Sequence, residues 1–389
     1  MRVSVSSFVR FTGFDLAHQL ADRGVLSALY TAYPSTKVDT RLRQRAQTAP
    51  WILAPQVAAG RLGLGRLEAR LNERAVRAFD RWVAGRLGPT DVFHCISSFG
   101  VESHRAARER YGALTVCDRG SSHILYQDEL LRDEHARWRV PYHGIPASLI
   151  ARELEEYETC DVICVPSAFA RRSFLERGVP SDKIRRVPLG VDLQLFRPEP
   201  KEDSVFRVIY VGHLSLQKGV QYLLSALCAP GIPKIEVWLV GAVADEVKSV
   251  LGQYRGRYRY VGVVPRAKLS WYYSQASVFV LASINDGFGL VQAQAMACGL
   301  PVVATANTGA EDLFSPGVEG FVVPIRDPEA IRERVLHLYA HPEVREEMGR
   351  AALRRVRALG GWDTYGAEAL EAYRAAIERQ RAERAQSAR

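Results

Sequence analysis

The chain has 389 residues, a net charge of +9, 47% apolar residues and 24% charged residues, which is the composition of a globular protein. That length favours two α/β domains of roughly 200 residues or fewer each over a single core. No apolar run approaches the ~20 residues of a membrane-spanning helix, and the first residues predict a β-strand rather than a signal peptide. These features argue against the membrane-spanning and secreted classes, so we expect a cytoplasmic protein.

The six cysteines predict neither a disulfide framework nor a zinc site. They form no CxxC pair, and most of them lie in apolar runs. We therefore expect reduced, buried thiols and no bound metal.

Strands and helices alternate through the first half of the chain. The predicted strands cover residues 2–8, 26–33, 91–97, 113–118, 161–167 and 184–190. Residues 13–24 predict a helix because apolar residues recur there at helical spacing. Another predicted helix ends at Gly178, shortly before the last of these strands.

The stretch from Arg41 to Arg86 is basic and amphipathic, and we expect it to be helical. It holds ten arginines against three acidic residues. Such a stretch can lie on an anionic membrane or hold an acidic acceptor, and a solvated helical face explains the same pattern. No motif points to nucleic acid.

The second half repeats the alternation, with predicted strands at residues 205–212, 235–241, 258–264, 277–283, 301–305 and 320–324. Residues 277–283 are apolar on both faces, as in parallel strands covered by helices on both sides. Prolines and a glycine between Pro188 and Pro200 predict a domain boundary. We expect an α/β fold of two doubly wound, Rossmann-like domains, residues 1–190 and 191–361, that face each other across a cleft. A final helix, residues 362–389, is expected to pack back on the N-terminal domain.

One glycine-rich string links a buried strand to a helix in the second half. The strand ends at Ser283, Asp286 follows in a short loop, and the helix is expected to end at Gly299. The glycines let the backbone approach a ligand closely, and the helix start points its N–H groups at the cleft.

This string, DGFGLVQAQAMACGLPVVAT, resembles the E-G-F-G and E-A-M-A-C-G-x-P-V-V-A-T signature of the family-4 retaining glycosyltransferases, which have the GT-B fold. The resemblance places Asp286 beside the donor sugar and Gln294 on the ribose hydroxyls. The family has Glu at both positions. A buried Gln294 that satisfies a loop carbonyl is the alternative. The resemblance also assigns donor contacts to the residues between them, which are Gly287, Phe288, Gly289 and Leu290.

A second string, Gly212-His213-Leu214 with Lys218-Gly219, opens the helix after the first strand of this half. It is similar to the family's G-R-L-x-x-x-K-G, whose Arg and Lys hold the donor diphosphate. Lys218 would then supply a point cation, and His213, in place of the Arg, would be charged only in part near neutral pH. An exposed lysine at a helix start is the alternative for Lys218.

Four further positions are candidates for the site. Gly309 and Glu311, after the strand at 301–305, match a glycine-rich turn that faces the donor in the family. Gly13 starts the first helix, where a loop would face the cleft. His123 is the candidate for the family's donor-sugar histidine, and its alternative is an incidental position at a capped helix start.

The resemblance implies a retaining, metal-independent transfer of a hexosyl group from a UDP-, GDP- or ADP-sugar to a glycan, lipid-linked or small-molecule acceptor. No DxD motif stands where it could bind a metal on the phosphates. The expected catalytic residues are His123, Lys218 and Asp286, with no cofactor. A non-catalytic nucleotide-sugar-binding GT-B protein and a sugar-nucleotide epimerase are the alternatives. Arg41–Arg86 is the candidate contact with the inner face of a membrane.

Overall fold

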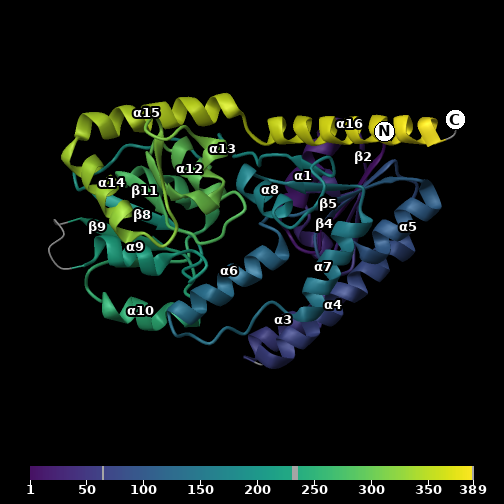
Figure 1. Ribbon diagram of the computed structural model, residues 1–389, viewed down its shortest axis with the longest axis horizontal. Coiled ribbons are helices and arrows are strands. Elements are labelled where there is room, and N and C mark those ends of the chain that lie inside the picture. The colour runs from purple at the N-terminus through teal and green to yellow at the C-terminus, as the bar shows by residue number, and fades with distance from the viewer. Residues whose placement is uncertain (64, 230–234, 388–389) are drawn as a thin grey trace.

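The computed structural model describes residues 1–63, 65–229 and 235–387. Within them the chain forms two α/β domains, each built on one parallel sheet covered by helices (Figure 1). This confirms the predicted fold class of two Rossmann-like domains.

The N-terminal sheet has seven strands in the order β3-β2-β1-β4-β5-β6-β7, all parallel. Its strands are β1 (Val3–Ser6), β2 (Leu26–Thr31), β3 (Ala46–Thr48), β4 (Val92–Ile96), β5 (Leu114–Asp118), β6 (Val162–Val165) and β7 (Ile184–Arg186). The strand order reverses between β1 and β4. In such sheets this switch point opens a crevice at the carboxyl ends of the strands.

Eight helices belong to this half among the described residues: α1 (Thr12–Asp22), α2 (Thr40–Arg43), α3 (Pro50–Arg61), α4 (Gly65–Arg86), α5 (Val101–Tyr111), α6 (Ile124–Arg137), α7 (Ala147–Thr159) and α8 (Ala168–Leu175). The Arg41–Arg86 stretch is mainly helical, as expected, but it also contains the short edge strand β3. The three residues of β3 are too few for an alternating pattern to reveal them in the sequence.

The C-terminal sheet has six parallel strands in the order β10-β9-β8-β11-β12-β13. They are β8 (Arg207–Val211), β9 (Glu236–Val240), β10 (Arg259–Gly262), β11 (Val278–Leu281), β12 (Val302–Thr305) and β13 (Gly320–Val323). The helices are α9 (Val220–Leu227), α10 (Lys248–Gln253), α11 (Leu269–Ser274), α12 (Leu290–Ala297), α13 (Ala310–Leu313), α14 (Pro328–Ala340) and α15 (Pro342–Leu359). β8, β11 and β12 are buried throughout, which explains their continuous apolar sequence.

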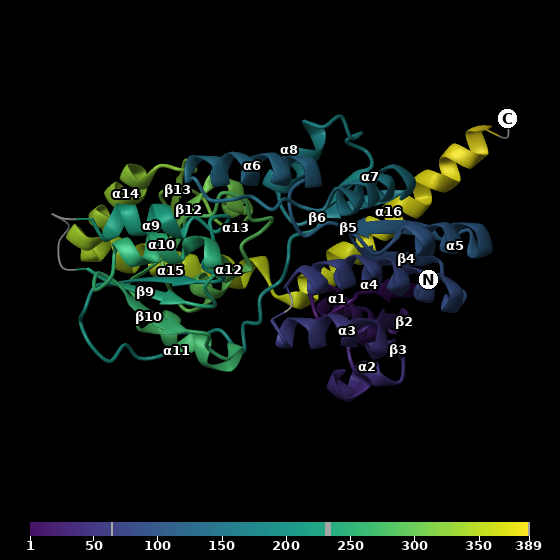
Figure 2. The ribbon, with the colours of Figure 1, turned by 90° about the horizontal axis from the view of Figure 1, so that it is seen from below.

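The last helix, α16 (Trp362–Ser387), runs back along the N-terminal domain, as Figures 1 and 2 show. Tyr365 and Tyr373 are buried in the same hydrophobic cluster as Val3 and Val5 of β1. The Tyr373 hydroxyl also lies 2.8 Å from His94 Nδ1. α16 thus completes the core of the first sheet.

The two domains are joined by a buried polar cluster on α6. Glu134 has no exposed surface and accepts hydrogen bonds from Arg326 Nε (2.7 Å), Tyr222 OH (2.7 Å) and Gln221 Nε2 (2.9 Å). All three donors belong to the C-terminal domain. A buried carboxylate with matched donors holds the domains in one arrangement, because separating them would leave charged groups unpaired.

Candidate functional site

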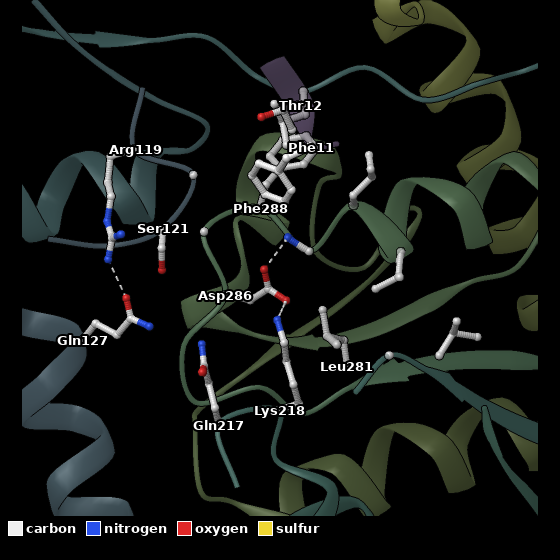
Figure 3. Close-up of a pocket in the computed structure, with 18 of the residues that line it drawn as sticks. Phe11, Thr12, Arg119, Ser121, Gln127, Gln217, Lys218, Leu281, Asp286 and Phe288 are labelled. Carbon is white, nitrogen blue, oxygen red and sulfur yellow. Dashed lines mark hydrogen bonds and ion pairs between the residues drawn. The ribbon is translucent and has the colours of Figure 1, made fainter. Parts of the chain in front are cut away.

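A cavity of about 420 Å³ lies between the domains, at the carboxyl ends of strands from both sheets (Figure 3). Its position follows from the two switch points, β1/β4 and β8/β11, where neighbouring loops diverge. The lining residues are Phe11, Thr12, Arg119, Gly120, Ser121, Gln127, Leu189, Tyr210, Val211, Gly212, Gln217, Lys218, Leu281, Asp286, Gly287, Phe288, Gly289, Leu290 and Val291.

Asp286 is held rigidly in the loop between β11 and α12. Its backbone N–H donates to Asn307 O at 2.9 Å, and its Oδ1 accepts from the Gly289 N–H at 3.0 Å. Gly289 has φ +57°, and a Cβ there would lie 2.7 Å from Leu281 Cδ2. Only glycine fits this backbone, so the string places the Asp286 carboxylate at the start of α12.

Lys218 and Asp286 form an ion pair on the cavity wall, with 2.5 Å between Nζ and Oδ2 (Figure 3). Lys218 reaches this place because Gly219, at φ +70°, allows the loop after β8 to lie against β11. A Cβ at Gly219 would be 1.7 Å from Ala282 O. Two residues that the sequence singled out separately, 68 positions apart, thus meet in the structure.

The N-terminal domain contributes the loops after β1 and β5. Arg119 is the charged residue of this side: its Nη1 donates to Glu153 Oε1 at 3.0 Å and its Nη2 to Gln127 Oε1 at 2.6 Å. Sequence reasoning did not single out Arg119. Its place directly after a buried strand, at the carboxyl edge of the sheet, was the available signal.

The loops of the two domains touch directly. A Cβ on Gly287 would lie 2.1 Å from Gly120 O, and Ser167 Oγ donates to Gly287 O at 2.5 Å. Asn285 accepts from Ser122 Oγ at 2.5 Å and donates to Ser121 Oγ at 3.0 Å. The cavity is therefore closed on one side by contacts between the domains.

Comparison with known proteins agrees with this geometry. Residues 13–195 match the family model described as Glycosyltransferase Family 4, and residues 205–341 match the model described as Glycosyl transferases group 1. This chain is a family-4 glycosyltransferase with the GT-B fold.

Two relatives and two solved structures illustrate the relationship. The chain is 27% identical to the D-inositol 3-phosphate glycosyltransferase of Kribbella flavida, over 95% of this chain and 91% of that protein. It is 31% identical to the enzyme of the same name from Xylanimonas cellulosilytica, over 52% and 54%. Sucrose-phosphate synthase from Thermosynechococcus elongatus superposes with a TM-score of 0.71 at 21% identity, covering 97% of this chain and 99% of that one. HepE from Anabaena, in complex with UDP, gives 0.68 at 16%, covering 96% and 100%. The two structures establish the fold.

The structure does not bring His123 to the glycosyltransferase cavity. His123 is 3% exposed, its Nδ1 accepts the Leu125 N–H at 3.2 Å at the start of α6, and its ring packs against Tyr157 and Phe174. Burial lowers the pKa of His123 to about 4, so the ring is neutral at physiological pH. The catalytic role expected of His123 therefore stays a prediction, and in this structure the His123 side chain caps the start of α6.

Three other expected donor residues also lie outside the cavity lining. Gln294 is buried in α12 and accepts a hydrogen bond from Tyr273 OH at 3.1 Å. Glu311 pairs with Arg172 of the N-terminal domain at 2.9 Å, on the surface. Gly13 packs on Ser7, where an added Cβ would lie 2.8 Å from the Ser7 Cβ. The neighbouring Phe11 and Thr12 line the cavity instead.

Gly309 and His213 are also displaced from their expected positions. Gly309 lies behind the Asp286 loop, where a Cβ would be 3.1 Å from Phe288 Cα. His213 is exposed and lines a second cavity of about 410 Å³ with His135 and His143. Gln127 and Gln217 line both cavities. Of the residues expected at the diphosphate, Lys218 lines the first cavity and His213 does not.

Proposed function

We propose that this glycosyltransferase moves a hexosyl group from a nucleoside-diphosphate sugar to an acceptor hydroxyl with retention and without a metal ion. The observation that carries the proposal is the Lys218–Asp286 pair in the interdomain cavity, at the N-terminus of α12. The pair combines a cation for the leaving diphosphate with a carboxylate for the sugar hydroxyls.

The charge that develops on the leaving diphosphate would be met by Lys218 and by the backbone N–H groups at the start of α12. Asp286 is the single carboxylate among the lining residues. A lone carboxylate already paired with Lys218 favours stabilisation by fixed protein charges over phosphates held through a carboxylate-bound metal.

Retention is proposed because the described cavity wall presents no free general base. Asp286 is paired with Lys218, and His123 lies in the core. The bond from the anomeric carbon to the phosphate oxygen would break while the acceptor oxygen bonds to the same face. The acceptor proton would pass to the departing phosphate oxygen, so the protein supplies mainly position and charge.

The test is transfer from UDP-, GDP- and ADP-sugars, with the anomeric configuration of the product read by NMR. An α-linked donor is expected to give an α-linked product, at an unchanged rate after treatment with EDTA. An inverted product would overturn retention, and a loss of rate reversed by added metal would overturn metal independence. Nucleotide binding with neither transfer nor donor hydrolysis would favour the non-catalytic alternative. A changed sugar nucleotide formed without acceptor would favour the epimerase.

We further propose that the α3–α4 hairpin contacts an anionic membrane surface, where a lipid-linked or surface glycan would be the acceptor. The two helices lie at the edge of the N-terminal domain, at the bottom of Figure 1, and α4 packs against α5. Trp51 is 59% exposed, Leu62 73% and Leu67 47%, and exposed arginines accompany them: Arg61, Arg70, Arg74, Arg77, Arg81 and Arg86. Apolar side chains beside arginines match the interface of an anionic bilayer.

No helix in the described residues has the length and hydropathy to cross a membrane, so the proposed contact is a surface contact. Flotation with phosphatidylglycerol vesicles tests it. Trp51→Ala with Leu62→Ser is expected to reduce binding strongly. Val263→Ser, which removes a residue 74% exposed on the other domain, is the control and should leave binding unchanged. No binding by the wild type at low salt, or equal binding to neutral vesicles, would contradict the proposal.

A further inference from the structure

The cavity has a second cation, Arg119, which faces it from the N-terminal domain. The charged side chains among its lining residues are Arg119, Lys218 and Asp286. Figure 3 shows Arg119 across the cavity from Lys218 and Asp286.

The charged residues of the C-terminal wall do not fully neutralise the negative charge of a bound diphosphate. The ammonium of Lys218 lies 2.5 Å from the Asp286 carboxylate, so much of its charge is compensated. His213, whose sequence position suggested a diphosphate contact, lines the second cavity instead. A nucleoside diphosphate carries more than one negative charge, and an anion in a partly enclosed site needs matching cations.

Arg119 supplies a second cation in a fixed position, and like Lys218 it is already paired with one carboxylate. Its guanidinium pairs with Glu153, whose side chain is 1% exposed, and its Nε donates to Ser122 O at 3.1 Å. Glu153 itself accepts from Ser98 Oγ at 2.6 Å and from Tyr157 OH at 2.5 Å. Burial is the largest influence on the pKa of Arg119 and lowers it, but the Glu153 carboxylate together with Tyr157, Cys117 and Glu156 raises that pKa above its ordinary value. The buried partner thus orients the guanidinium before any ligand arrives.

One edge of the Arg119 guanidinium can exchange its present hydrogen-bond partner for a ligand. Nη2 donates to Gln127 Oε1 at 2.6 Å, and Gln127 is itself a lining residue. A phosphate oxygen can take the place of this neutral amide oxygen and gain a charge-assisted bond. The Glu153 bond, made by Nη1 on the buried side, need not break.

The loop that carries Arg119 is also anchored to the donor loop. Gly120 contacts Gly287, and Ser121 and Ser122 bond to Asn285. Arg119 therefore keeps its place relative to Asp286 whenever the domains are closed as they are here.

We propose that Arg119 binds the donor diphosphate from the N-terminal domain, so that Arg119 and Lys218 hold the anion between them from opposite walls. This inference rests on the proposed glycosyl transfer from a nucleoside-diphosphate sugar. It adds a contact by which the anion itself links the two domains.

Calorimetric titration tests the contact without an identified acceptor. UDP, GDP and ADP are titrated into the wild type, and the tightest binder and its nucleoside are then titrated into Arg119→Gln. The diphosphate is expected to bind about tenfold to a hundredfold more weakly, while the nucleoside binds with unchanged affinity. Arg119→Lys should recover part of the loss.

Two further variants separate a phosphate contact from a structural role. Arg119→Gln with Glu153→Gln leaves Glu153 with no unpaired buried charge, so this variant is expected to fold even if the single change does not. Arg172→Gln removes an arginine that also bridges the domains, to Glu311, but outside the cavity, and should leave both affinities unchanged.

Equal weakening of diphosphate and nucleoside would overturn the proposal and leave Arg119 a structural role. Unchanged diphosphate affinity would overturn it as well, and slower transfer in that case would assign Arg119 to the acceptor. If the wild type binds none of the three nucleotides, the proposed function fails, which is a different result from a failure confined to Arg119→Gln.

Discussion

On the C-terminal side of the cavity, glycines let the loops after β8 and β11 interlock, whereas on the N-terminal side a buried ion pair places Arg119. Lys218 and Asp286 owe their meeting to Gly219 and Gly289, which stand next to or near them in the sequence. Arg119 owes its orientation to Glu153, 34 residues away on α7. The donor side is thus determined largely by local sequence, and the other side by tertiary contacts.

The largest effect is expected from Lys218→Ala, which removes the cation of the donor side. Turnover with a nucleotide sugar should fall by about a hundredfold to a thousandfold, because charge on the leaving group loses a fixed stabiliser. Initial rates with the preferred donor measure it. Lys248→Ala, which removes an exposed lysine paired with Asp245, is the control. A rate within twofold of the wild type would remove Lys218 from the site.

A somewhat smaller effect is expected from Gly287→Ala, which acts at the contact between the two sides. The added Cβ would lie 2.1 Å from the backbone oxygen of Gly120, so the domains must move apart. We expect kcat/KM to fall by about tenfold or more, since displacement of the reacting groups by about 1 Å is costly. Gly252→Ala, which meets nothing within 4 Å, should keep full activity. Normal activity of Gly287→Ala would show that the closed contact is dispensable.

His123→Ala should lower the free energy of unfolding by about 1 kcal/mol through the lost cap of α6, with a further loss because the buried ring leaves a cavity, and should leave kcat/KM of the folded protein unchanged. His123→Asn, which retains a capping side chain, should restore the contribution of the cap. Chemical denaturation and steady-state kinetics measure the two quantities. A loss of kcat in His123→Asn at normal stability would restore the catalytic role that the sequence suggested.

An effect confined to stability and to high pH is expected at Asp15, in the first turn of α1. Burial raises its pKa from 3.8 to about 6, and Arg266 and Arg10 offset the rise only in part. The folded state therefore holds the proton more tightly than the unfolded state, and stability falls as the pH rises from about 4 to about 6. Asp15→Asn should stabilise the protein by about 2 kcal/mol at pH 8 and by little at pH 4. Equal effects at both pH values would contradict this assignment.

The fold and half of the site were accessible from the sequence. Buried parallel strands such as β11 are apolar on both faces, and glycines in the Asp286 string stand where the backbone needs them. β3 could not be predicted because its three residues, at the edge of the sheet, are too few to show an alternating apolar pattern. The place of His123 could not be predicted, because distance along the chain after β5 does not show which side chain turns to the cavity and which caps α6. Arg119 could not be predicted because its partner Glu153 lies on another helix. The two side chains meet only when α7 packs on the sheet.

Hydrogen–deuterium exchange with and without the bound nucleoside diphosphate tests the central claim most directly. The two-sided cavity predicts slower exchange in residues 119–127 of the N-terminal domain and in residues 212–219 and 285–290 of the C-terminal domain. Protection confined to the C-terminal domain, or centred on residues 135–145 beside the second cavity, would contradict it.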